Sequence, residues 1–235
     1  MSIRFRFRGH GLAVWVRGIQ LILLVAGVVL LGFAGFTLTR AHLYQIREGR
    51  AFNHTLRQTQ ASDNHGTASL QSEAKSYIRF RTTSPARGEP IARIEIPRIG
   101  LNTLVLEGDD TRTLRLGAGH IPGTSFPGEA GNVAIAGHRD TFFRHLRNIE
   151  KNDTITLRTP AGSYNYRVEA LRVVTPNDVG VLGPTPDNIL TLITCYPFHF
   201  VGPAPDRFIV RARQLPTSSY AMEADHKDNA GTKKS

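Results

Sequence analysis

The longest uncharged run of the chain constrains its fold more than any other feature. Residues 19–38 read IQLILLVAGVVLLGFAGFTL, with no charged residue and a single Gln near the start. Such a run makes a helix of about 30 Å, the thickness of the hydrocarbon core of a bilayer. Four arginines precede it, and the positive-inside rule keeps a basic N-terminus in the cytoplasm. The sequence therefore predicts a basic cytoplasmic segment over 1–18, a single-pass membrane anchor over 19–39, and export of the remainder.

A cleaved signal peptide is the alternative interpretation of this run. Gly32-Phe33-Ala34 has the small-x-small form of a cleavage site. The apolar core of a signal peptide usually has about 7–15 residues, however, and this run is longer. Its length favours a retained anchor. Both interpretations place the rest of the chain outside the cytoplasm.

The formal net charge of +10 is concentrated before the folded domain. Residues 1–40 carry five arginines and no acidic residue, whereas residues 87–215 carry fifteen basic and thirteen acidic residues. A nucleic-acid-binding protein needs a basic face on its folded domain. The nearly neutral domain argues against nucleic acid as a partner.

Composition divides the exported part into three regions. Residues 40–88 form a juxtamembrane segment and linker, in which the loose spacing of Leu43, Ile46 and Phe52 favours a helix over 41–60. From Gln60 to Gly88 the chain is too polar to offset its ordering entropy, which predicts a flexible spacer. Residues 216–235 are a polar tail on the same grounds. The domain itself covers residues 89–215.

Short strand patterns separated by Gly and Pro recur through this domain. They cover residues 92–96, 101–106, 132–136, 154–158, 163–174, 189–195 and 207–215. One short helix is expected over 140–149, where Phe142, Leu146 and Ile149 share a face at helical spacing. Many short strands with little helix predict an all-β fold, a closed or nearly closed β-barrel.

Three of these strands end or begin at residues that can carry chemistry. Cys195, the sole cysteine, ends an apolar strand, and Arg207 begins the next strand after a Pro-rich loop. If the two strands pair antiparallel, the end of the first lies beside the start of the second. His138 follows a third strand through Gly137, directly before the expected helix, whose dipole would lower the pKa of the imidazole.

These residue types suit acyl transfer through a thiolate. A nearby cation favours the thiolate form of Cys, His moves protons, and Arg stabilises an oxyanion. Each residue also has an ordinary structural interpretation. Cys195 alone is compatible with inert packing, His138 with a hydrogen-bonded structural role, and Arg207 with a solvated charge.

A resemblance to a known family links the three residues. Thr191-Leu192-Ile193-Thr194-Cys195 resembles the TLxTC signature of the sortases, and Pro205-Asp206-Arg207-Phe208-Ile209-Val210 resembles the Arg-bearing strand that follows it. Residues 119–124 contain His120, and residues 132–139 contain His138 and end at Arg139. These two stretches resemble the two His-containing segments of the sortases. The similarity covers about residues 89–215 and fits class D best.

The resemblance implies an eight-stranded β-barrel with one or two short helices, and a site with stated roles. Cys195 would be the nucleophile, His138 the general acid/base and Arg207 the oxyanion stabiliser. Thr194 would position the substrate or complete the oxyanion site. His120 would support the site from behind or be purely structural.

The implied activity is that of a membrane-anchored cysteine transpeptidase. It would cleave a Leu-Pro-x-Thr-Gly-like sorting signal on exported proteins between Thr and Gly and transfer the acyl group to an amine. That amine would belong to a peptidoglycan precursor or a pilin. No cofactor is implied, and no metal is assigned to Glu107, Asp109 and Asp110, which are interpreted as an acidic surface turn. A hydrolytic cysteine peptidase and a non-enzymatic cell-wall-binding barrel are the alternatives.

Overall fold

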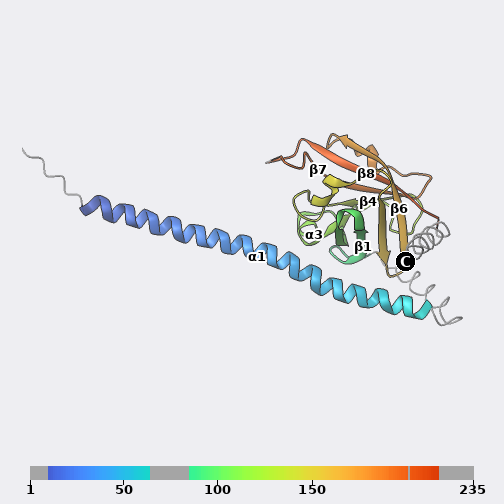
Figure 1. Ribbon diagram of the computed structural model, residues 1–235, viewed down its shortest axis with the longest axis horizontal. Coiled ribbons are helices and arrows are strands. Elements are labelled where there is room, and N and C mark those ends of the chain that lie inside the picture. Colours follow the sequence, from blue (N-terminus) through green and yellow to red (C-terminus); the bar gives the residue numbers. More distant parts are fainter. Residues whose placement is uncertain (1–9, 64–84, 201, 217–235) are drawn as a thin grey trace, which may run out of the picture. The chain divides into compact units, whose positions relative to one another are not determined.

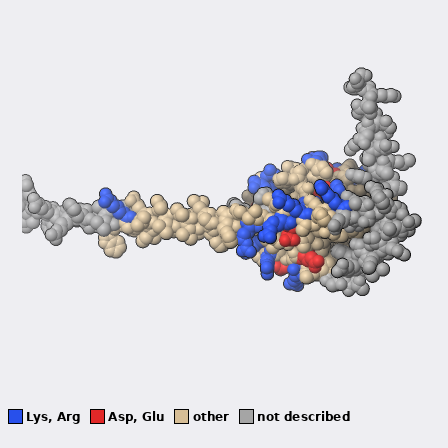
Figure 2. Space-filling model, turned by 90° about the horizontal axis from the view of Figure 1, so that it is seen from below, with Lys and Arg blue, Asp and Glu red and all other residues tan. Residues whose placement is uncertain are grey.

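The computed structural model describes residues 10–63, 85–200 and 202–216, and it divides into two compact units, Met1–Leu43 and Tyr44–Ser235. In the first unit the structure describes the N-terminal part of helix α1 (His10–Asp63). Its large apolar side chains from Ile19 to Phe36 are more than half exposed. Figure 2 shows this uncharged stretch in tan, with blue basic atoms near its start. Such a helix is long and apolar enough to cross a membrane, as predicted.

The second unit is built on a closed barrel of eight strands (Figure 1). They are β1 (Pro90–Ile96), β2 (Leu101–Glu107), β3 (Ala118–His120), β4 (Asn132–Ala136), β5 (Thr154–Thr159), β6 (Gly162–Val174), β7 (Ile189–Tyr196) and β8 (Asp206–Gln214). Their order around the barrel is β1-β2-β3-β4-β7-β8-β6-β5, and β5 pairs with β1 to close it. The predicted all-β barrel is therefore confirmed. Hydrophobic alternation missed only β3 among these strands, because it is three residues long.

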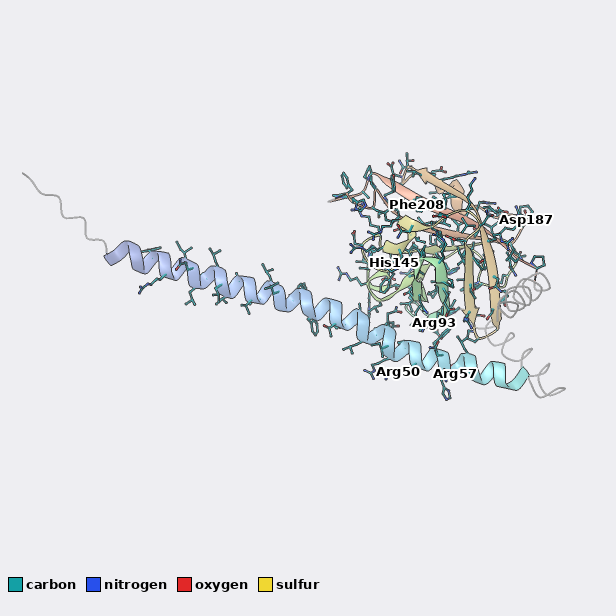
Figure 3. The ribbon with its side chains drawn as sticks, in the orientation of Figure 1. Arg50, Arg57, Arg93, His145, Asp187 and Phe208 are labelled. Atoms are coloured by element: carbon teal, nitrogen blue, oxygen red, sulfur yellow. The ribbon has the colours of Figure 1, made fainter. Side chains whose placement is uncertain are left out.

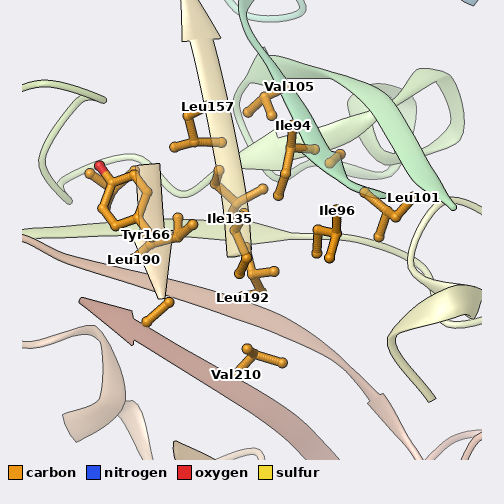
Figure 4. Packing of buried hydrophobic residues seen from close by; sticks show 14 of the residues in the cluster. Ile94, Ile96, Leu101, Val105, Ile135, Leu157, Tyr166, Leu190, Leu192 and Val210 are labelled. Carbon is orange, nitrogen blue, oxygen red and sulfur yellow. The ribbon is translucent and has the colours of Figure 1, made fainter. Parts of the chain in front are cut away.

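Strand alternation fills the barrel with aliphatic side chains. In the regular parts of the strands every second residue points inward, because successive side chains of a strand point to opposite faces. Figure 4 shows the inward set packed together: Ile94, Ile96, Leu101, Val105, Ile135, Leu157, Tyr166, Leu190, Leu192 and Val210. On β7 and β8 the even-numbered residues face this core. The odd-numbered residues of these two strands therefore face outward.

The central strands of the barrel bring distant parts of the chain together. β4 pairs parallel with β7, and β7 pairs antiparallel with β8. The carboxyl ends of β4 and β7 and the start of β8 consequently meet at one rim. All three predicted reactive residues belong to this rim.

The helix predicted over 140–149 is wrong in type. Residues 139–143 form turns, and only Arg144–Asn148 is helical, as the 3-10 helix η2. The buried residues Phe143, Leu146 and Ile149 recur every third residue, which is the period of a 3-10 helix. His138 therefore does not precede an α-helix, and no helix dipole acts on it. Two further 3-10 helices are η1 (Pro97–Ile99) and η3 (Val179–Leu182).

The acidic segment after β2 also differs from its prediction as a surface turn. Glu107 is buried at the end of β2, and only Asp109 is fully exposed. Asp110 caps helix α3 (Thr111–Leu116) by accepting hydrogen bonds from the backbone N–H groups of Arg112 and Thr113. A hydrogen bond from the Thr113 hydroxyl, together with these backbone bonds, lowers the pKa of the Asp110 carboxyl. The segment is thus a helix start.

Helix α1 continues through the predicted juxtamembrane segment and contacts the barrel within the second unit. Phe52 is only 7% exposed and packs with Leu104 and Leu106 of β2. The side-chain amide of Gln45 donates to Leu116 O and accepts from Leu104 N at 3.1 Å. Arg93, labelled in Figure 3, donates to Asn53 at 3.2 Å. Residues 44–56 are therefore part of the globular unit, while most of the predicted spacer, 64–84, and the tail, 217–235, lie outside the described residues.

Candidate active site

Cys195 and Arg207 are direct neighbours across the last strand pair. Register pairing in β7 and β8 places Cys195 opposite Arg207, one residue before the pairing ends at Tyr196 and Asp206. Directly opposed residues of an antiparallel pair point to the same face, with Cβ atoms about 4.5–5.5 Å apart. Both are odd-numbered and outward-facing, and both are half-buried. The residue with the free thiol is thus the cross-strand neighbour of a permanently charged residue on the outer face of the barrel wall.

His138 reaches the same place from β4. Ala136 pairs with Ile193, and the backbone N–H of Gly137 continues the ladder by donating to Ile193 O at 3.1 Å. Two residues beyond the pair Ala136–Ile193 stand His138 and Cys195. Ile135 faces the core, so Ala136 faces outward, and His138 follows two residues beyond this outward-facing position. The imidazole is half-buried.

Thr194 joins the ends of these two strands. Its side chain is 2% exposed, and its hydroxyl donates to Gly137 O at 2.8 Å. The side chain lies on the inner side of the wall, opposite to Cys195. The hydroxyl therefore fixes the backbone that carries His138, and only the main chain of Thr194 is available on the outer side.

His120 lies apart from these residues, on β3. It is 1% exposed, and its Nδ1 is 2.7 Å from the Glu107 carboxylate. Its Nε2 is 3.0 Å from Ser125 O and 3.2 Å from Thr124 Oγ1, and its ring stacks on Phe126. Both nitrogens are thus used inside the fold. The geometry favours the structural interpretation of His120 over direct contact with a substrate.

Arg139 is a rim residue that sequence reasoning did not single out. Its guanidinium is 7% exposed and donates to three backbone carbonyls of the β7–β8 connection. They are Pro197 O at 2.8 Å, Phe200 O at 2.6 Å and Gly202 O at 3.1 Å. Its partners are main-chain groups about sixty residues away, so no sequence pattern predicts these contacts. Arg139, which directly follows His138, is therefore hydrogen-bonded to the segment that joins Cys195 and Arg207.

An aromatic cluster supports the base of the same connection. The rings of Tyr196, Phe198 and Phe208 lie 5.4 to 6.2 Å apart, in stacked and edge-on contacts. Tyr196 follows Cys195, and Phe208, labelled in Figure 3, follows Arg207. Arg207 itself donates to Ala204 O and Asp206 O at 3.3 and 2.9 Å. The strand ends that carry the thiol and the guanidinium are therefore held by packing and hydrogen bonds.

Comparison with known proteins gives a consistent result. The model of the sortase domain family matches residues 94–215, which contain all three rim residues. Sortase D of Bacillus subtilis is 30% identical over 198 residues, covering 84% of this chain and 98% of the relative. A sortase D5 transpeptidase of Clostridium perfringens has a similar structure, with a TM-score of 0.56 and 28% identity over 70% of this chain and 98% of its own. Sortase C-1 of Actinomyces oris has a TM-score of 0.53 and 25% identity, covering 63% and 98%. With its closed eight-stranded barrel and a family match across the domain, this chain belongs to the sortases, a family of cysteine transpeptidases.

Proposed function

We propose that the protein is a class D sortase that recognises a Leu-Pro-x-Thr-Gly-like signal on exported proteins and joins the acyl fragment to an amine. The observation that carries this proposal is the pairing of Cys195 with Arg207, while His138 follows the strand that pairs parallel with β7, two residues beyond the Ala136–Ile193 pair. The proposed roles are nucleophile for Cys195, general acid/base for His138 and oxyanion stabiliser for Arg207. The match to sortase D of Bacillus subtilis, over most of both chains, supports the class.

The first half of the reaction cleaves the signal. The Cys195 thiolate attacks the carbonyl carbon of the Thr residue, and the negative charge moves to the carbonyl oxygen, where Arg207 stabilises it. The tetrahedral intermediate collapses, the Thr–Gly bond breaks, and His138 gives a proton to the departing Gly amine. A thioester between Cys195 and the Thr carbonyl remains.

The second half transfers the acyl group. An incoming amine attacks the thioester carbon, and a second tetrahedral intermediate forms at the same oxyanion position. His138 accepts the proton of the amine, the C–S bond breaks, and the thiolate of Cys195 is restored. The amine would be that of a peptidoglycan precursor or a pilin. If water takes its place, the same residues perform hydrolysis, which is the side reaction and the runner-up activity.

The membrane arrangement follows from the N-terminal helix. We infer an uncleaved single-pass anchor with a cytoplasmic N-terminus and an extracytoplasmic barrel, supported by the apolar helix and the arginines that precede it. The substrate signals and the wall precursors would then meet the barrel outside the cytoplasm.

A product assay separates the candidate functions. The full chain in detergent is incubated with a panel of sorting-signal peptides, with and without triglycine, and the products are identified by mass spectrometry. A peptide ending in Thr joined to triglycine is the expected product. Only free acid at every amine concentration would indicate a hydrolase. If neither the protein nor its Cys195→Ala variant cleaves any peptide, the non-enzymatic cell-wall-binding barrel is the remaining candidate function.

A further inference from the structure

Arg139 is a buried charge whose only close acceptors among the described residues lie near the proposed site. A guanidinium has five N–H donors and loses its hydration when buried, so it needs compensating acceptors. Three carbonyls of the β7–β8 connection supply them, at 2.6 to 3.1 Å. The Phe200 ring lies 5.9 Å below the guanidinium carbon. The carboxylate of Asp140, 3.6 Å away, is 74% exposed and adds little.

The position of these contacts suggests a purpose beyond stability. Arg139 follows His138 directly, and its acceptors belong to the segment that starts after Cys195 and leads to Arg207. The register of β7 and β8 already fixes Cys195 against Arg207. Nothing in that register fixes the connection itself, or its relation to His138. Among the described side chains, the Arg139 guanidinium joins the β7–β8 connection to the segment that carries His138.

We propose that Arg139 is a positioning residue for the transpeptidase reaction, holding the β7–β8 connection against the His138 segment. The assignment rests on the proposed roles of Cys195, His138 and Arg207. The planar fork matters as much as the charge, because three carbonyls in different directions need several fixed donors. A Lys ammonium in this place is a compact point charge and does not reproduce the fork.

The experiment compares Arg139→Gln and Arg139→Lys with the wild-type full chain in detergent. Arg213→Gln is the matched control, since Arg213 lies at the end of β8 away from Arg207, where it pairs with Glu169 and Asp187. The measurements are kcat and KM for a cleaved peptide, the melting temperature, and hydrogen exchange of the segments carrying Phe200 and Ile94. The second segment reports on the core.

We expect Arg139→Gln to lower kcat on the order of 10-fold to 10²-fold, the scale of a small misplacement of reacting groups. Exchange should rise at Phe200 and not at Ile94, and Arg139→Lys should fall between Gln and wild type. Arg213→Gln should leave kcat unchanged. Unchanged kcat and unchanged exchange at Phe200 in Arg139→Gln would overturn the proposal, as would exchange that rises equally at both segments.

The experiment distinguishes a failure of the proposed transpeptidase function from a failure of the proposed role of Arg139. If the wild type cleaves no peptide, the proposed function fails, and alkylation of Cys195 by iodoacetamide replaces kcat as the readout. A selective rise in exchange at Phe200 with an altered alkylation rate would still support positioning by Arg139. An alkylation rate equal to that of wild type would refute it.

Discussion

At the scale of single residues, one odd–even alternation decides what can react. Leu192 and Val210 point into the core, so Cys195 and Arg207 point out. A slip of one residue in β7 would turn the thiol into the core and leave Arg207 opposite Thr194 or Tyr196. The apolar packing that fixes the register therefore also fixes the proposed chemistry.

Arg207→Lys tests whether the guanidinium acts on the reacting atoms. Lys keeps the charge but loses the fork of donors, so kcat should fall on the order of 10²-fold or more if Arg207 stabilises the oxyanion. Arg211→Lys is the control, because Arg211 lies on the same face of β8, opposite Thr191. Steady-state kinetics should show a large loss for the first variant and none for the second. Near-wild-type kcat in Arg207→Lys would reduce its role to bulk charge.

The contacts within this site differ in how far the sequence could predict them. The Cys195–Arg207 neighbourhood follows from a strand, a short loop and a strand, which is local information. His138 arrives through the parallel pairing of β4 with β7, about sixty residues apart, and only the family resemblance connected it. From the sequence, Glu107 was interpreted as part of a surface turn. Its partner His120 becomes its neighbour only when β2 and β3 pair.

At the scale of elements, the C-terminal part of α1 changes role from linker to packing element. Its spacing predicted a helix, and that is correct. The barrel surface that receives it could not be predicted, since Leu104 and Leu106 read as ordinary strand residues. In the fold their side chains lie outside the core cluster and are fully buried against α1. Without this helix the barrel would expose an apolar patch.

Phe52→Ala tests this docking. Removing a buried Phe side chain should lower the free energy of unfolding by roughly 3 kcal/mol, the low end for Phe→Ala substitutions. Arg50→Ala, an exposed change on the same helix, should lower it by less than about 0.5 kcal/mol. Urea unfolding of the full chain in detergent provides the measurement. Equal stabilities of the two variants would mean that α1 does not dock on β2.

At the scale of the whole molecule, the sequence predicted a membrane helix followed by an all-β domain. The structure has an N-terminal helix long and apolar enough to cross a membrane, and a closed β-barrel after it. The order of the strands around the barrel could not be predicted from the sequence. Closure pairs β5 with β1 and β4 with β7, which lie far apart in the chain, and local alternation carries no information on such pairs. The strand count came from the family resemblance.

Topology gives a whole-molecule prediction. A reporter fused after Ser235 should be active only outside the cytoplasm, because the arginines before residue 19 hold the N-terminus inside. Protease added to spheroplasts should digest the barrel and spare the N-terminal segment and the apolar span. Complete protection of residues after 87 in intact spheroplasts, with digestion after lysis, would reverse the orientation.

The most direct test of the central claim is the intact mass of the protein after brief exposure to a sorting-signal peptide, followed by acid quenching. The account predicts a mass increment equal to the peptide up to its Thr, located at Cys195, released by hydroxylamine but not by mild reducing agent, and absent in Cys195→Ala. Iodoacetamide should alkylate the free thiol in the folded protein, and the peptide should protect it. An unmodified mass across the whole peptide panel, together with a Cys195 that resists alkylation until the protein is denatured, would contradict the account.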